Sequence, residues 1–70
     1  MRALYHMRKA RNLSRRSIAI LVGVHDQTIH TWEVGKREPR WSQAKRIAQI
    51  FDMSLDELAE AEKKEEEVVA

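Results

Sequence analysis

Cysteine is absent from this 70-residue chain, and glycine and long apolar runs are scarce. Without cysteine, neither disulfide bonds nor thiolate metal sites can form. The only glycines are Gly23 and Gly35, so there is no glycine-rich loop of the kind that cradles phosphate groups. No apolar run approaches the roughly 20 residues needed to cross a bilayer, and no signal-peptide pattern is present. We therefore expect a soluble, cytoplasmic protein without a membrane partner.

Residue patterns typical of enzymes and metal sites are also lacking. His25 and His30 are five residues apart, so they do not share a helical face as metal ligands four residues apart would. Together with His6, they are better explained as surface histidines. No arrangement of Ser, His and Asp suggests a catalytic set. We accordingly predict no enzyme, no catalytic residue, no metal site, and no cofactor or small-molecule substrate.

The net charge of +2 hides an asymmetry along the chain. Residues 1–51 contain eleven Lys or Arg and three Asp or Glu, a net charge of +8, whereas residues 52–70 contain two Lys and eight acids, a net charge of −6. A cationic body suits a phosphate backbone, because each neutralised phosphate releases counterions. The alternative is that the charges are merely solvated. The length allows one small domain, whose stability margin is small unless it dimerises.

Apolar residues recur at helical spacing along most of the chain. We expect helices over residues 2–11, 15–22, 26–33 and 41–51, and a fifth helix that begins after Ser54. Ser14 caps the second helix, and Ser54 and Glu57 form a capping box for the fifth. Left-handed helix ends are expected at Asn12, Gly23 and Asp52. The prediction is an all-α fold, a compact bundle of four to five short helices.

Residues 14–33, SRRSIAILVGVHDQTIHTWE, have the pattern of two short helices joined by a tight turn at Gly23. In the second helix, Ile29 and Trp32 lie three apart on one face, and polar residues cover the other faces. These are His25, Asp26, Gln27, Thr28, His30 and Thr31. A polar outer surface over a buried stripe is what a helix needs to contact base edges in a DNA major groove.

This stretch resembles the helix-turn-helix of the phage-repressor and Cro-like (XRE-type) family. The matching positions are Arg8, Leu13, Ser14, Ala19, Gly23, Val24, Thr28, Ile29, Trp32, Glu33, Gly35, Pro39, Ala48, Phe51, Ser54, Leu55, Asp56 and Leu58. They extend through WEVGKREP and FDMSLDEL, so the resemblance covers about residues 4–58. It implies a lambda-repressor-like DNA-binding domain over residues 1–58. Residues 59–70 are then an acidic C-terminal helix extension or a frayed tail.

The resemblance assigns base contacts to the helix at 26–33 and phosphate contacts to its surroundings. The candidates for base contact are Asp26, Gln27, Thr28 and Thr31, with Thr28 nearer the rim. The candidates for phosphate contact are Arg15, Arg16, His30, Lys36, Arg37, Arg40 and Gln43. Gln27 is the strongest of all, because its amide can pair with both N6 and N7 of adenine. Asp26 either accepts from a cytosine N4 or simply favours the helix N-terminus.

Arg8 lies close to the apolar stripe of the first helix, although it is charged. In the resembling family this position pairs with the acid at the end of the recognition helix, here Glu33. A buried Arg–carboxylate pair can be bidentate and fix the angle between two helices. The alternative is that both are solvated surface charges.

Two departures from the family pattern lie in the helix at 15–22. Arg15 replaces a Gln that touches a phosphate and braces the recognition helix; Arg can still reach phosphate but is expected to brace less well. Ile20 and Leu21 occupy positions that are usually polar. They are either tucked into a local contact or form an apolar patch for a partner subunit.

The last two helices carry two further expectations. Trp41 is expected in the core, because it shares helical spacing with Ala44; the alternative is stacking on a sugar or base. Apolar residues become sparse after Leu58, so the acidic run is expected to fray. Alternatively it extends as a helix and places Val68 and Val69 against a partner.

These features predict sequence-specific binding of double-stranded DNA by a small transcriptional regulator, a repressor. One recognition helix offers few base contacts, so we expect a homodimer on a palindromic site. The candidate interface residues are Ile20, Leu21 and Leu58. The alternative function is a protein-interaction module with the same fold, such as an antitoxin or adaptor.

Overall fold

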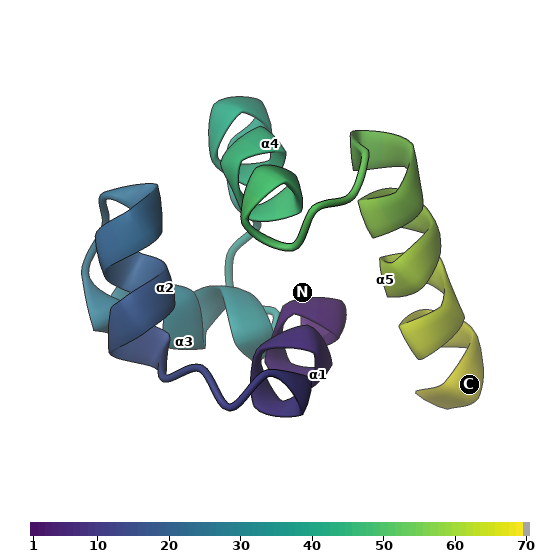
Figure 1. Cartoon of the computed structure of the whole chain (residues 1–70). Coiled ribbons are helices and arrows are strands. Elements are labelled where there is room, and N and C mark those ends of the chain that lie inside the picture. Colours follow the sequence, from purple (N-terminus) through teal and green to yellow (C-terminus); the bar gives the residue numbers. More distant parts are fainter. Residues whose placement is uncertain (70) are drawn as a thin grey trace.

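The computed structural model describes residues 1–69, except for the side chains of residues 68–69. Its five helices are α1 (Arg2–Ala10), α2 (Arg15–Val22), α3 (Asp26–Glu33), α4 (Trp41–Ile50) and α5 (Leu55–Val69). No strand occurs in this part of the chain, and the predicted all-α bundle is confirmed. Figure 1 shows α1 and α4 between the α2–α3 pair on one side and α5 on the other. None of the described helices is long and apolar enough to span a membrane.

Local sequence signals fix most of the helix ends. The Ser17 N–H donates to Ser14 Oγ at 3.0 Å, which satisfies a free donor in the first turn of α2. At α5, the Glu57 N–H donates to Ser54 Oγ and the Ser54 N–H donates to Glu57 Oε1, at 3.0 and 2.8 Å. Left-handed backbone follows the helices at Asn12 (φ 57°), Gly23 (φ 88°) and Asp52 (φ 55°). All three stand where the sequence predicted them.

The core receives at least one large apolar side chain from every helix. Those from the first four helices are Leu4, Ile18, Ile29 and Ile47, and all four are fully buried. Trp32, Phe51 and Leu58 close the core around them. Each such side chain contributes roughly 1.5–3 kcal/mol of transfer free energy, so the core holds the helix-turn-helix and α5 in one body.

The acidic C-terminal segment is helical and is attached to α1. The Ala3 N–H donates to Glu62 Oε1 at 3.0 Å, and His6 Nδ1 lies 2.7 Å from Glu65 Oε1. The expected fraying is therefore not found within the described residues, and the alternative, a helix extension, is what the structure has. The suggested contact of Val68 and Val69 with a partner concerns side chains outside the described part, as does Ala70.

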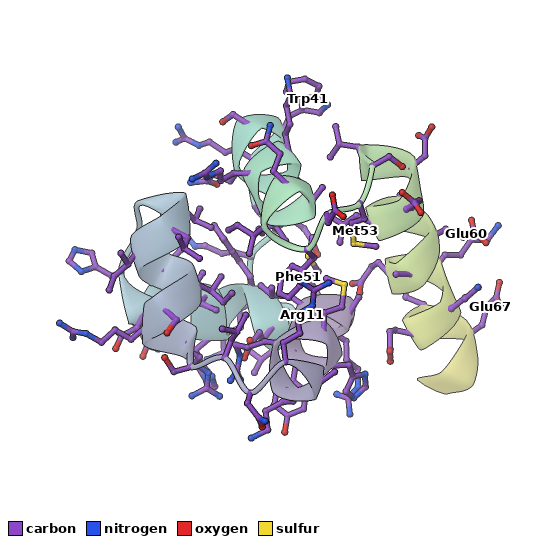
Figure 2. The ribbon with its side chains drawn as sticks, viewed as in Figure 1. Arg11, Trp41, Phe51, Met53, Glu60 and Glu67 are labelled. Carbon is purple, nitrogen blue, oxygen red and sulfur yellow. The ribbon has the colours of Figure 1, made fainter. Side chains whose placement is uncertain are left out.

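Trp41 corrects an expectation from the sequence. Its side chain is 68% exposed rather than in the core, and Lys45 Nζ lies 5.3 Å from the centroid of its ring. Helical spacing identifies the face of α4 but not how far the core extends along it. Figure 2 shows Trp41 at the N-terminal end of α4, with its ring pointing away from the other helices.

Leu58 corrects a second expectation. It was a candidate for a partner interface, but it is only 2% exposed and belongs to the core cluster of this chain. Because α5 folds back onto α1 and α4, the side chain of Leu58 is buried within the domain. Ile20 and Leu21 remain exposed.

Candidate nucleic-acid interface

The helix-turn-helix is formed by α2 and α3, which pack on each other around the turn at Gly23. The N–H groups of Gly23 and Val24 both donate to the carbonyl oxygen of Ala19, at 2.8 and 3.0 Å. This closes α2 and redirects the chain into α3. The buried Ile29 and Trp32 anchor α3 from the core side. They determine which residues of α3 face solvent.

The outer surface of α3 carries the predicted base-contacting residues. Asp26 and Gln27 are exposed, while Thr28 and Thr31 are half-buried. The Thr31 hydroxyl donates to the carbonyl oxygen of Gln27 at 2.9 Å. Its proton is therefore engaged with the backbone, which leaves the methyl group and an oxygen lone pair for contact with a base. Gln27 keeps its amide exposed at the first turn of α3, where a recognition helix enters the groove.

A hollow of about 520 Å³ between α3 and α4 brings base and phosphate candidates together. Its lining residues are Gln27, Thr28, Thr31, Trp32, Arg37, Glu38, Arg40 and Gln43. The Arg40 N–H donates to Gln43 Oε1 at 2.8 Å, so the Gln43 oxygen caps α4 and its NH2 group is available to donate to a phosphate. Lys36 is exposed in the same loop but does not line the hollow.

A second hollow, of about 360 Å³, lies on the opposite side of Gln27. Its lining residues are Arg8, Ser14, Arg15, Arg16, Asp26, Gln27 and His30. His30 is half-buried, and its Nδ1 atom has no hydrogen-bond partner among the described residues. The three guanidinium groups of this hollow outnumber its one carboxylate, that of Asp26, which favours an anion there. Cationic side chains therefore flank the start of the recognition helix on both sides.

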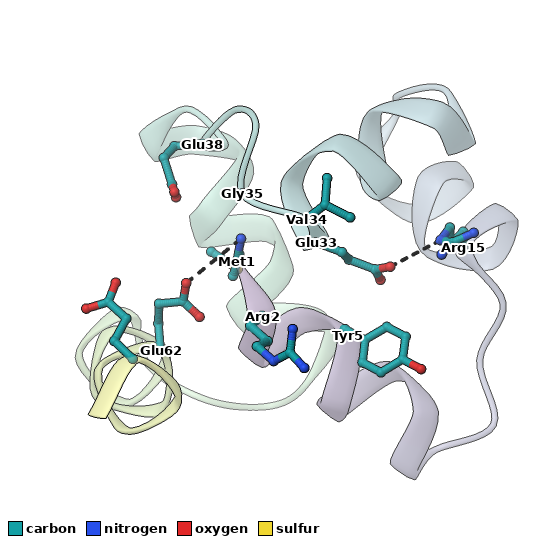
Figure 3. Close-up of a pocket in the computed structure, with 10 residues that line it drawn as sticks. Met1, Arg2, Tyr5, Arg15, Glu33, Val34, Gly35, Glu38 and Glu62 are labelled. Carbon is teal, nitrogen blue, oxygen red and sulfur yellow. Dashed lines mark hydrogen bonds and ion pairs between the residues drawn. The ribbon is translucent and has the colours of Figure 1, made fainter. Parts of the chain in front are cut away.

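A third hollow, shown in Figure 3, is unsuited to phosphate. Its lining includes Glu33, Glu38, Glu62 and Glu66 beside Arg2 and Arg15. The carboxylates outnumber the guanidinium groups, so a phosphate would meet repulsion. Neither this hollow nor any other part of residues 1–69 contains a cluster of His, Asp and Glu arranged to hold a metal ion.

Arg8 and Glu33 form a buried, bidentate ion pair that joins α1 to the end of α3. Arg8 Nε donates to Glu33 Oε2 at 2.7 Å and Nη2 donates to Oε1 at 3.2 Å. Nη1 donates to the carbonyl oxygen of Leu13 at 3.0 Å, and the ring of Tyr5 covers the guanidinium at 5.4 Å. Both charged residues are 6% exposed, so the alternative of solvated surface charges does not apply. The pair fixes the position of α3 relative to α1.

Sequence reasoning missed two contributions. Arg15 Nε donates to Glu33 Oε1 at 3.1 Å, so Arg15 does brace the recognition helix, through its last residue. Nothing local signals this contact, because the partners are 18 residues apart. Met1 is buried in the core. It stands three residues before Leu4, and extending the apolar stripe of the first helix backwards by one turn could have found it.

Comparison with known proteins agrees with this geometry. The sequence model of the helix-turn-helix domain family matches residues 2–61, so the chain belongs to this family. Neither a curated protein nor a solved structure matches the chain. Membership of the family indicates DNA binding, and such domains are typically not enzymes.

Proposed function

We propose that the protein binds double-stranded DNA sequence-specifically and acts as a cytoplasmic transcriptional repressor. The observation that carries this proposal is the position of Gln27, which is exposed at the start of α3 and lines both cationic hollows. A side chain that contacts bases, with phosphate-binding groups on either side, is the arrangement that major-groove recognition needs. Repression requires only that the bound protein occupy its site.

The contacts divide by chemistry. Gln27 pairs with an adenine, Asp26 accepts from a cytosine N4, and Thr31 offers its methyl group to a thymine. Thr28 contributes at the rim. Flanking phosphates are held from one side by Arg15, Arg16 and His30, and from the other by Lys36, Arg37, Arg40 and Gln43.

The test is selection of bound duplexes from a random-sequence library, with wild type and Gln27→Ala side by side. We expect a palindromic consensus for the wild type and lost preference at one position of each half-site for the variant, worth about 1–3 kcal/mol. Lys36→Ala is the matched control, because loss of a phosphate contact weakens all sequences alike and lowers the salt slope by about one. Equal weakening of all duplexes by Gln27→Ala would contradict the assignment of Gln27 to base contact.

We further propose that the DNA-bound form is a homodimer whose subunits meet at α4 and α5. An apolar hollow of about 280 Å³ lies there, lined by Ala44, Leu55 and Ala59 among others, and Trp41 is one helical turn from Ala44. Trp41 and Gln43 are two residues apart, so they point to nearly opposite sides of α4. This places Trp41 away from the DNA-facing hollow, and the ring of each subunit can enter the hollow of the other, as two-fold symmetry requires. Sedimentation of wild type and Trp41→Ala tests the proposal, which predicts dissociation of the variant.

A second candidate function is a protein-interaction module, such as an antitoxin or adaptor. The observation that favours it is the exposure of Ile20 (69%) and Leu21 (46%) on α2. An apolar patch of this kind suits a protein partner. Ionic strength discriminates the two functions, because DNA affinity falls steeply with salt whereas binding through Ile20 and Leu21 changes little.

A further inference from the structure

Glu33 stands at the centre of a network that reaches the proposed DNA contacts. It is buried at the end of α3, and its Oε1 atom accepts from both Arg8 and Arg15, at 3.2 and 3.1 Å. The two guanidinium groups differ in exposure. The Arg8 side chain is 8% exposed, whereas that of Arg15 is 43% exposed. One arginine therefore belongs to the interior and the other to the surface, and Glu33 joins them.

The contact with Glu33 uses only the Nε group of Arg15. Its two Nη groups, with four N–H donors between them, have no hydrogen-bond acceptor among the residues whose side chains the structure describes. Figure 3 shows the Arg15 guanidinium held against Glu33 beside the start of α2. Arg15 also lines the cationic hollow that contains Arg16, His30 and Gln27.

We propose that Glu33 is a positioning residue for DNA contact, which holds the Arg15 guanidinium so that its Nη groups bind a phosphate beside the recognition helix. The assignment rests on the proposed DNA binding, which already gives Arg15 a phosphate contact, and adds the residue that holds the Arg15 guanidinium in place. Arg8 contributes to the phosphate contact through its charge rather than through a contact of its own. Its charge offsets that of Glu33, so the three side chains together remain cationic and a phosphate is attracted rather than repelled.

Arginine is required at position 15 for a geometric reason. Its planar guanidinium can donate to Glu33 through Nε and to a phosphate through Nη at the same time. A lysine has a single ammonium group, which cannot span both acceptors in a fixed orientation. A glutamine could contact the phosphate but would carry no charge. Holding the side chain in advance also reduces the rotamer entropy lost on binding.

The first test compares Arg15 with its neighbour Arg16 in DNA affinity measured as a function of salt. Arg16 lines the same hollow and is exposed, and it has no ion pair among the described residues, which makes it the matched control. We expect Arg15→Gln to weaken binding of all duplexes about tenfold and to lower the salt slope by about one. Arg15→Lys should keep the salt slope but weaken binding about threefold, while Arg16→Lys, which exchanges one unbraced phosphate-binding cation for another, should keep the slope and weaken binding less.

The second test measures the coupling between Glu33 and Arg15 in a double-mutant cycle with Glu33→Gln and Arg15→Gln, with folding of each variant checked by circular dichroism. We expect Glu33→Gln to weaken DNA binding severalfold more when Arg15 is present than when Arg15 is replaced, because in the second case only the loss of the Arg8 contact remains. If Glu33→Gln does not fold, the Arg15→Lys and Arg16→Lys pair decides the question, because neither variant disturbs the Arg8–Glu33 pair.

Three results would overturn the assignment while leaving DNA binding intact. These are additive effects in the cycle, equal effects of the two lysine variants, and a change of sequence preference in Arg15→Gln, which would mean that Arg15 contacts a base. A wild-type chain that binds no duplex at low salt would instead overturn the proposed function itself, and the assignment with it.

Discussion

Two short side-chain contacts extend from α1, and they differ in burial rather than in length. The Arg8–Glu33 pair joins α1 to α3 at 2.7 Å, and its side chains are 8% and 2% exposed. The His6–Glu65 pair joins α1 to α5 at the same distance, but its side chains are 47% and 24% exposed. Water screens the second contact but is excluded from the first. Breaking the first contact is therefore expected to cost more free energy of unfolding, although the two distances are equal. The recognition helix is therefore held by a buried ion pair in addition to the apolar side chains of Ile29 and Trp32, whereas α5 depends mainly on apolar burial.

The largest effect should come from breaking the buried pair. Glu33→Gln leaves the guanidinium of Arg8 without its charged partner in the interior, so we expect a loss of about 3–5 kcal/mol in the free energy of unfolding. Urea denaturation measures it, and Glu38→Gln, at an exposed glutamate, is the control. An unchanged midpoint in Glu33→Gln would contradict the energetic weight given to this pair.

A somewhat smaller loss is expected when the apolar attachment of α5 is weakened. Leu58→Ala removes a side chain that is almost fully buried, and such truncations cost about 2–5 kcal/mol. Thermal unfolding followed by circular dichroism measures the loss. Leu55→Ala is the control, because Leu55 is only half-buried and should cost less. Similar losses for the two variants would show that Leu58 has no special part in holding α5.

The smallest effect should follow loss of the exposed pair. Glu65→Gln is expected to lower the free energy of unfolding by less than about 1 kcal/mol, because water screens this contact. Amide hydrogen exchange in α5 is the sharpest measurement, and strong loss of protection there would refute the view that apolar burial holds the helix.

Helix positions followed from the sequence because their causes are local. Ser14, Ser54 and Asn12 act on residues within one turn of themselves, and apolar spacing identifies the buried face of each helix. The partner of Arg8 was available only through resemblance to a family, since 25 residues separate it from Glu33. Nothing comparable pointed to the contact of Arg15.

The expectations from the sequence that differ from the structure concern how deeply a side chain is buried and which residues distant in sequence are in contact. The spacing of Trp41 marks a face of α4, yet the core ends before that residue. The acidic run was expected to fray because its apolar content is low, but Ala3 and His6 bind its glutamates across 59 residues of sequence. Such contacts depend on how helices are placed in space, which local patterns do not contain.

The placement of α5 has a consequence for how the molecule approaches its partner. Residues 1–51 have a net charge of +8 and residues 52–70 of −6, and α5 lies on the far side of α1 and α4 from the helix-turn-helix. The protein is therefore an electric dipole whose positive end carries α3. The electric field of a polyanion orients such a dipole during its approach. A larger share of diffusional encounters therefore begins with α3 facing the polyanion. Salt should slow association for this reason as well as weaken the final complex.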